Sequence, residues 1–140
     1  MIFHAVIDTN VVISAMLKDI SVPGSIIDHA LNGKIVPLFD HDILAEYKDV
    51  LSRPKFKISQ QRMEKLLSDI IARGQFIEAK DFEDELPDPK NVVSYHVVLT
   101  AREEVDAYLV TGNLKHFPIK TFVVTPREML DIIERDGDAD

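Results

Sequence analysis

Residues 2–17, IFHAVIDTNVVISAML, decide the fold. The first six of them are mostly apolar and stop at Asp8, a pattern typical of a short buried strand. The triplet Asp8-Thr9-Asn10 offers three side chains that can cap a helix, and an apolar run follows it directly. The stretch therefore predicts a buried strand that leads into a helix, with an acidic side chain at the junction.

The rest of the chain repeats this alternation of strands and helices. We expect further strands at residues 35–39, 75–77, 107–111 and 121–124, and further helices at 23–31, 42–53, 59–73, 89–102 and 126–135. Such alternation favours an α/β fold with a mostly parallel sheet and helices on both of its faces. The chain has 140 residues and no repeat or linker, which predicts one domain over 1–135 and a polar, frayed tail at 136–140.

The composition excludes several classes of protein. Apolar residues make up 46% of the chain, enough for a sizeable core, and there is no cysteine for disulfides, zinc thiolates or thiol chemistry. We expect a soluble cytoplasmic protein, because the start lacks an export signal and no apolar run approaches the ~20 residues of a membrane helix. Motifs for nucleotide cofactors and acyl transfer are missing.

His96, in an apolar helix, is interpreted as a hydrogen-bonded core histidine.

The charge is negative overall but unevenly distributed. The net charge of −8 is not typical of a nucleic-acid binder, which tends to carry a basic patch. Residues 48–73 nevertheless hold seven basic residues against three acidic ones, and residues 78–88 hold six acidic residues against one lysine. Two interpretations stay open: solvated helix faces and a surface loop, or a basic flank beside an acidic pocket. The second suits a metal-dependent enzyme that acts on a polyanion.

Acidic and amide side chains gather near the ends of the predicted strands. Ligands of open α/β sheets bind outside the carboxyl ends of the strands. Asp8 follows the first strand, Asn113 lies just past a later strand, and Asp106 directly precedes that later strand. Asp88 stands at the start of the apolar helix, with Asn91 one turn further on. We expect these oxygen ligands to converge on one sheet edge, where they suit Mg²⁺ or Mn²⁺ rather than zinc.

Glu46 stands out because of its place on a helix. At 100° per residue it sits about 40° from Val50, on the shoulder of the apolar stripe. A glutamate there is expensive to bury unless it is paired or bound to metal, although it could also reach water from the edge of the stripe. Structural roles remain open for the other candidates: Asp8 and Asp88 as helix caps, and Asp106 and Asn113 as turn residues.

Four motifs in order resemble those of PIN-domain proteins. They are VIDTNVV at 6–12, ILAEYKDVLSRPKF at 43–56, LPDPKN at 86–91 and DAYLVTGNLKHF at 106–117. The resemblance implies a three-layer α/β/α fold with a central, mostly parallel sheet, and an endoribonuclease that uses Mg²⁺ or Mn²⁺ to hydrolyse single-stranded RNA. It also implies a homodimer that is the toxin of a type II toxin–antitoxin pair, a VapC-like ribonuclease with an antitoxin protein as its partner.

The resemblance also implies roles for particular residues. The acidic positions of the family match Asp8, Glu46, Asp88 and Asp106, which would be catalytic and would bind the metal together with Asn91 and Asn113. The residues expected to contact RNA or to orient ligands are Thr9, Asn10, Thr111, Arg53 and Lys55.

Two of these positions depart from the family pattern. Asn91 and Asn113 stand where aspartates are common, and an amide can ligate a metal but brings no charge. Two amides should therefore weaken Mg²⁺ binding and the activation of water. The alternative is a catalytically weakened PIN-like module that binds RNA or a protein partner without cleavage. A phosphatase with Asp8 as nucleophile ranks low, because Asn10 occupies the place of its second aspartate.

Overall fold

A computed structural model describes residues 1–83, 86 and 91–137. In this part of the chain, five strands form one sheet in the order β3-β2-β1-β4-β5, and every pairing is parallel. The strands are β1 (Phe3–Ile7), β2 (Ile35–Phe39), β3 (Gln75–Phe76), β4 (Ala107–Val110) and β5 (Val123–Val124). The helices are α1 (Thr9–Leu17), α2 (Val22–Asn32), α3 (His41–Leu51), α4 (Gln60–Arg73), α5 (Val92–Ala101) and α6 (Pro126–Gly137), with short 3-10 turns η1 (Pro54–Phe56) and η3 (Leu114–His116).

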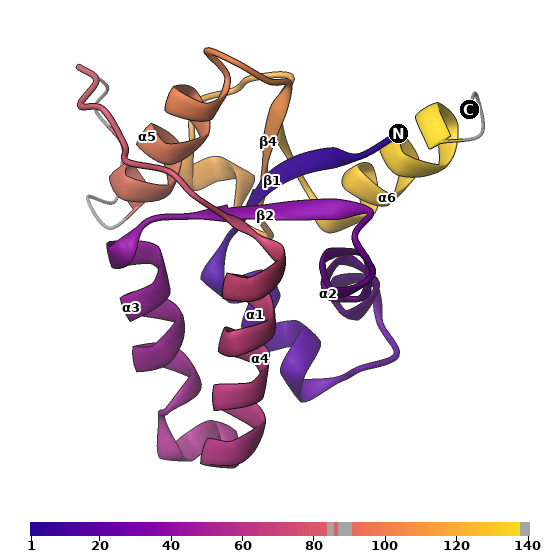
Figure 1. Cartoon of the computed structure of the whole chain (residues 1–140), viewed down its shortest axis with the longest axis vertical. Coiled ribbons are helices and arrows are strands. Elements are labelled where there is room, and N and C mark those ends of the chain that lie inside the picture. Colours follow the sequence, from indigo (N-terminus) through magenta and orange to yellow (C-terminus); the bar gives the residue numbers. More distant parts are fainter. Residues whose placement is uncertain (84–85, 87–90, 138–140) are drawn as a thin grey trace.

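Helices cover both faces of this sheet. Figure 1 shows α5 on one side of β2 and the group α1 to α4 on the other side. Helix α5 packs along β1, β2 and β4, while α6 packs against α2. The predicted α/β fold with a central, mostly parallel sheet and three layers is confirmed.

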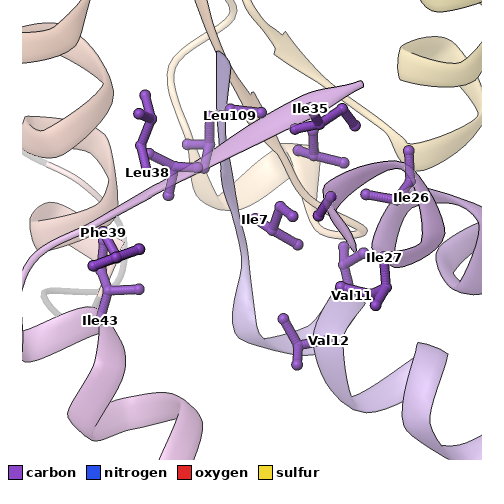
Figure 2. Packing of buried hydrophobic residues seen from close by; sticks show 14 of the residues in the cluster. Ile7, Val11, Val12, Ile26, Ile27, Ile35, Leu38, Phe39, Ile43 and Leu109 are labelled. Atoms are coloured by element: carbon purple, nitrogen blue, oxygen red, sulfur yellow. The ribbon is translucent and has the colours of Figure 1, made fainter. Parts of the chain in front are cut away.

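Strand β1 is the centre of the molecule. It pairs with β2 on one side, with Phe3 opposite Ile35, and with β4 on the other, with Ile7 opposite Val110. An apolar strand suits this place because parallel sheets are covered on both faces. Ile7 is 1% exposed, and Figure 2 shows it in the interior near Val11 of α1 and Ile27 of α2.

Several helices begin and end at residues that commonly cap helices. Ser21 and Ser59 cap α2 and α4, and Gly33 ends α2 with a φ of 91°, a conformation that favours glycine. Helix α6 begins with a capping box, in which the Thr125 N–H donates to Glu128 Oε1 (2.8 Å) and the Glu128 N–H donates to Thr125 Oγ1 (3.1 Å).

Several predicted boundaries were wrong. Helix α3 ends at Leu51 rather than near residue 53, since Pro54 opens the separate turn η1. The strand predicted at 121–124 is only the pair Val123–Val124. Helix α6 continues to Gly137, past the start of the predicted tail. The start of the helix predicted at 89–102 falls partly outside the described residues.

No single helix in the described part of the chain is long and apolar enough to cross a membrane. Within these residues, α1 and α2 together reach such a length and apolar composition, but they are bent by 102° relative to each other.

Leu51 anchors the end of α3 and is fully buried, with 0% of its surface exposed. We expect Leu51→Ala to lower the free energy of unfolding by about 2–5 kcal/mol, because it leaves a cavity in the core. Urea denaturation followed by circular dichroism measures the change. Leu17→Ala, at a helix position that is 53% exposed, is the control and should stay within about 0.5 kcal/mol of the wild type. Equal effects of the two changes would contradict this account of the core.

Candidate active site at the carboxyl edge of the sheet

Asp8 joins the ends of the two central strands. It follows β1 directly and is 8% exposed. Its Oδ1 accepts a hydrogen bond from the Thr9 N–H (2.8 Å), and its Oδ2 accepts one from the Thr111 hydroxyl (2.6 Å), just past β4. The Asp8 N–H donates to the Val110 carbonyl (2.9 Å). Asp8 is therefore a helix cap, as one interpretation held, and also a buried carboxylate held from two elements.

The turn after β4 extends this network. The Thr111 hydroxyl oxygen accepts a hydrogen bond from the Asn113 N–H (3.0 Å), and the Gly112 N–H donates to Asn10 Oδ1 (3.3 Å). Asn10 and Asn113 line one pocket of about 240 Å³ beside Gly112. The structure thus brings together several of the predicted residues: Asp8, Thr9, Asn10, Thr111 and Asn113.

Glu46 lies in a groove that runs along α3. Asp40 caps this helix by accepting a hydrogen bond from the Ile43 N–H (2.8 Å). Glu46 is half-buried, as a place on the shoulder of the apolar stripe predicts. The groove has a volume of about 370 Å³, extends to Arg53, and is walled on the α5 side by Val93 and Ser94.

Burial dominates the electrostatics of Asp8. Loss of water raises the pKa of its carboxyl group above the ordinary value. The hydrogen bond from Thr111, the Thr9 N–H and the charge of His116 each act in the opposite direction and only partly offset burial. The charged form of Asp8 is therefore held in place by its partners at a net cost to the folded state.

Tyr47 is a site residue that sequence reasoning missed. It is 2% exposed, and its hydroxyl donates a hydrogen bond to the carbonyl of Ile7. Burial raises the pKa of this hydroxyl, and the negative charges of Asp8 and Glu46 raise it further. The usable signal was the hydroxyl itself, because a tyrosine on an apolar stripe needs a hydrogen-bond partner when it is buried.

Asp106 corrects the expectation that all the acidic residues converge on one edge. It precedes β4, whose first residue, Ala107, pairs with His4 near the start of β1. Asp8 follows the end of β1, so the length of the strands separates the two carboxylates. Asp106 lines a different pocket, of about 590 Å³, together with Met1 and Asp136. The prediction that Asp106 stands next to a strand is correct, but it lies at the amino end of β4, at the opposite edge of the sheet from Asp8.

The other predicted residues lie in different places. Asp88 falls outside the described residues. Asn91 is half-buried at the N-cap of α5 and makes no capping bond with its side chain. Arg53 and Lys55 are exposed beyond the end of α3, where Arg53 pairs with Asp49 at 3.2 Å.

His96 is buried as expected, but its ring is not fully hydrogen-bonded. Its ring packs edge-on to Phe82 with centroids 5.5 Å apart. Its Nε2 has no hydrogen-bond partner in the described part of the chain. The interpretation as a hydrogen-bonded core residue is therefore wrong for this atom.

The chemical type of the donor atoms at this edge suits a hard divalent cation. Asp8 and Glu46 supply carboxylate oxygens, and Asn113 supplies an amide oxygen, which are ligands that Mg²⁺ and Mn²⁺ prefer. Within residues 1–83, 86 and 91–137, no three side chains of His, Cys, Asp or Glu are grouped so that they could hold a metal ion. The chemistry of the donors fits such an ion, and the third carboxylate of the family pattern, Asp88, lies outside these residues.

Asp8 and Thr111, which are joined by a hydrogen bond at the carboxyl edge of the sheet, lie within a region that matches a known family. Residues 4–115 match the family model described as a PIN domain. The match covers most of the chain, so the chain belongs to the PIN-domain family, whose members are generally nucleases that use divalent metals. No curated protein and no solved structure gives a significant match.

The raised pKa of Asp8 predicts how stability depends on pH. The folded state keeps the Asp8 proton to a higher pH than the unfolded chain, whose ordinary value is 3.8. The stability that protonation contributes is therefore present at low pH and is lost as pH rises through the folded pKa. Asp8→Asn removes this loss, so without metal its melting temperature should rise relative to the wild type over the pH range from the ordinary value of 3.8 up to the raised folded pKa.

Thermal unfolding with EDTA across this pH range measures the difference. Asp28→Asn, at an exposed position of α2, is the control and should give a constant difference. A difference for Asp8→Asn that is flat, or that falls with pH, would contradict the unfavourable burial of the Asp8 charge.

Proposed function

We propose that this chain is a metal-dependent ribonuclease that hydrolyses phosphodiester bonds of single-stranded RNA. The observation that carries the proposal is the buried Asp8 carboxylate, oriented by Thr111 and Thr9 at the carboxyl edge of a PIN-domain sheet. Burying a charge is expensive, and a bound cation would offset this. A structural cap alone does not need such burial, because an exposed aspartate caps a helix equally well.

The ligands of the ion would be Asp8 and Glu46, with Asp88 as the third carboxylate. A Mg²⁺ or Mn²⁺ ion bound there would lower the pKa of a water molecule and neutralise charge on the phosphate. The chain itself supplies orientation: Thr111 and the Thr9 N–H hold both oxygens of Asp8. The amide groups of Asn10 and Asn113 can donate hydrogen bonds to phosphate oxygens.

Single-stranded RNA fits the groove along α3 and the basic corner beyond it. Glu46 lies five residues before the end of α3 at Leu51, about 8 Å along the helix, and Arg53 follows two residues later, so one bound strand can contact both. Arg53, Lys55 and Lys57 are exposed at this corner, and Figure 1 shows α3 and α4 extending together away from the sheet toward it. In a chain with a net charge of −8, binding of a polyanion depends on such a local basic surface.

We further infer that this ribonuclease is the toxin of a type II toxin–antitoxin pair, acting as a homodimer in the cytoplasm. This inference rests on the four motifs at 6–12, 43–56, 86–91 and 106–117. A neighbouring gene for a small protein that binds this chain and inhibits its cleavage of RNA would support it. Normal growth of cells that produce the active enzyme without an inhibitor would contradict it.

The alternative function is a PIN-like module that binds RNA or a protein partner without cutting. Its motivation is that amides occupy positions 91 and 113, which lowers the negative charge available to a cation. The two functions differ in their response to metal. A ribonuclease of this kind should be stabilised by millimolar Mn²⁺, because a ligand of the folded state raises its stability. Unchanged thermal stability in Mn²⁺ would favour the binding module.

Asp8→Asn should abolish the Mn²⁺-dependent cleavage of a fluorescent single-stranded RNA. We expect a loss greater than the roughly 10–100-fold that removal of an outer-shell partner produces, because Asp8 would be a direct ligand. Asp106→Asn changes a carboxylate in the same way at the opposite end of the sheet and should keep wild-type rates. Unchanged cleavage by Asp8→Asn would refute the proposed mechanism, and a matching loss in Asp106→Asn would refute the placement of the site.

Lys55 should contribute to RNA affinity through its charge. Binding of a single strand weakens with salt, and each phosphate contact adds roughly 0.7 to the slope of log K against log salt. Lys55→Ala in an Asp8→Asn background, which prevents cleavage, should therefore weaken binding and reduce this slope by up to about 0.7. Fluorescence anisotropy across a salt series measures both values. Lys120→Ala, at an exposed loop position before β5, should leave the slope unchanged, and equal slopes in all variants would exclude the corner from the RNA path.

A further inference from the structure

The hydroxyl of Tyr47 connects two elements that carry different parts of the site. The pairing of β1 with β2 ends at Ala5 and Pro37. Ile7 lies two residues beyond this end, and its carbonyl accepts a hydrogen bond from Tyr47 of α3. A buried carbonyl without a partner is costly, so Tyr47 supplies a bond at a point where the described sheet pairing between β1 and β2 has ended.

Both ends of this hydrogen bond are adjacent in sequence to a carboxylate of the site. Tyr47 follows Glu46 directly, and Ile7 directly precedes Asp8. A bond between Tyr47 and Ile7 therefore ties the backbone that carries Glu46 to the backbone that carries Asp8. This hydrogen bond joins α3 to β1 at the carboxyl edge of the sheet.

The surroundings keep Tyr47 in the form that this bond requires. The residue is 2% exposed, and the charges of Asp8 and Glu46 raise the pKa of its hydroxyl beyond the effect of burial. Both effects favour the neutral hydroxyl, which is the form that donates the hydrogen bond to Ile7. A neutral donor in this place also adds no charge that would compete with a cation for the two carboxylates.

We propose that Tyr47 is a positioning residue that sets the separation of Asp8 and Glu46 for a divalent cation. This proposal rests on the proposed metal-dependent function, which it deepens. Tyr47 itself touches neither the ion nor the substrate. It acts through the backbone of its neighbours, in the way that outer-shell groups orient the ligands of metal sites.

Tyr47→Phe tests the proposal, because it removes the hydroxyl and keeps the ring. The measured quantity is the Mn²⁺ concentration that gives half of the maximal rise in melting temperature. We expect this concentration to rise roughly 10–100-fold, the effect typical of losing an outer-shell partner. Cleavage of RNA by the variant should return toward the wild-type rate at saturating Mn²⁺.

Tyr95→Phe is the matched control. Tyr95 is 1% exposed on α5 and stacks on Phe122 with centroids 6.5 Å apart. This variant also loses a buried hydroxyl, so its melting temperature without metal should fall, while the Mn²⁺ concentration for half of the effect should stay at the wild-type value. A change shared by both variants would show that general loss of stability explains the result, and would overturn the positioning role.

The remaining outcomes separate this proposal from the function on which it rests. A wild-type protein without any response to Mn²⁺ would overturn both. A responding wild type with an unshifted Tyr47→Phe would overturn the positioning role alone. Should Tyr47→Phe fail to fold, Glu46→Asp replaces it, because it keeps the charge and Tyr47 but withdraws the carboxylate by one methylene. The same rise in the Mn²⁺ concentration is then expected, and an unchanged value would overturn the importance of the spacing.

Discussion

The burial of one charged side chain, Asp8, is the constraint on which the site depends. Its carboxylate lies at the meeting point of β1, α1 and the turn after β4, and it is held by the hydroxyl of Thr111 and the N–H of Thr9. A hydrophobic residue there would suit the core better, because loss of water makes the charged form unfavourable. The fold therefore keeps a locally unfavourable group at the place where parallel strands end and ligands bind.

Hydrogen-bonding groups contact this charge, whereas a second carboxylate and basic residues lie on α3 and just beyond its end. Next to Asp8, the Thr111 hydroxyl donates a hydrogen bond to its carboxylate, and the Gly112 N–H donates one to the side chain of Asn10. Glu46 approaches from a separate helix that is tied to β1 through Tyr47. The positive charges lie further out, at the end of α3. Under the proposed function, an RNA strand would meet these basic residues first and the carboxylates only within the groove.

Local signals made much of the fold predictable, whereas the site needed information on tertiary structure. The strand at residues 35–39 was placed to the residue, since a compact apolar run stands between a glycine turn and a capping aspartate. Asp8 was identified by its position after a strand. Asp106 was misplaced because a strand has two ends, and nearness in sequence does not say which end faces the ligand. Tyr47 was missed because its partner is a backbone carbonyl 40 residues away, which no periodicity reveals.

The pocket at the opposite edge has a practical consequence for work with this protein. Met1 and Asp136 line that pocket together, so the first residue and the last helix meet at the end of the sheet that faces away from Asp8. Figure 1 shows the N-terminus beside α6. A dye, an affinity handle or a fused reporter attached near either of these positions would project from the rear of the molecule. Such attachments leave the groove along α3 open, so the chain can be immobilised with its carboxylates facing the solution.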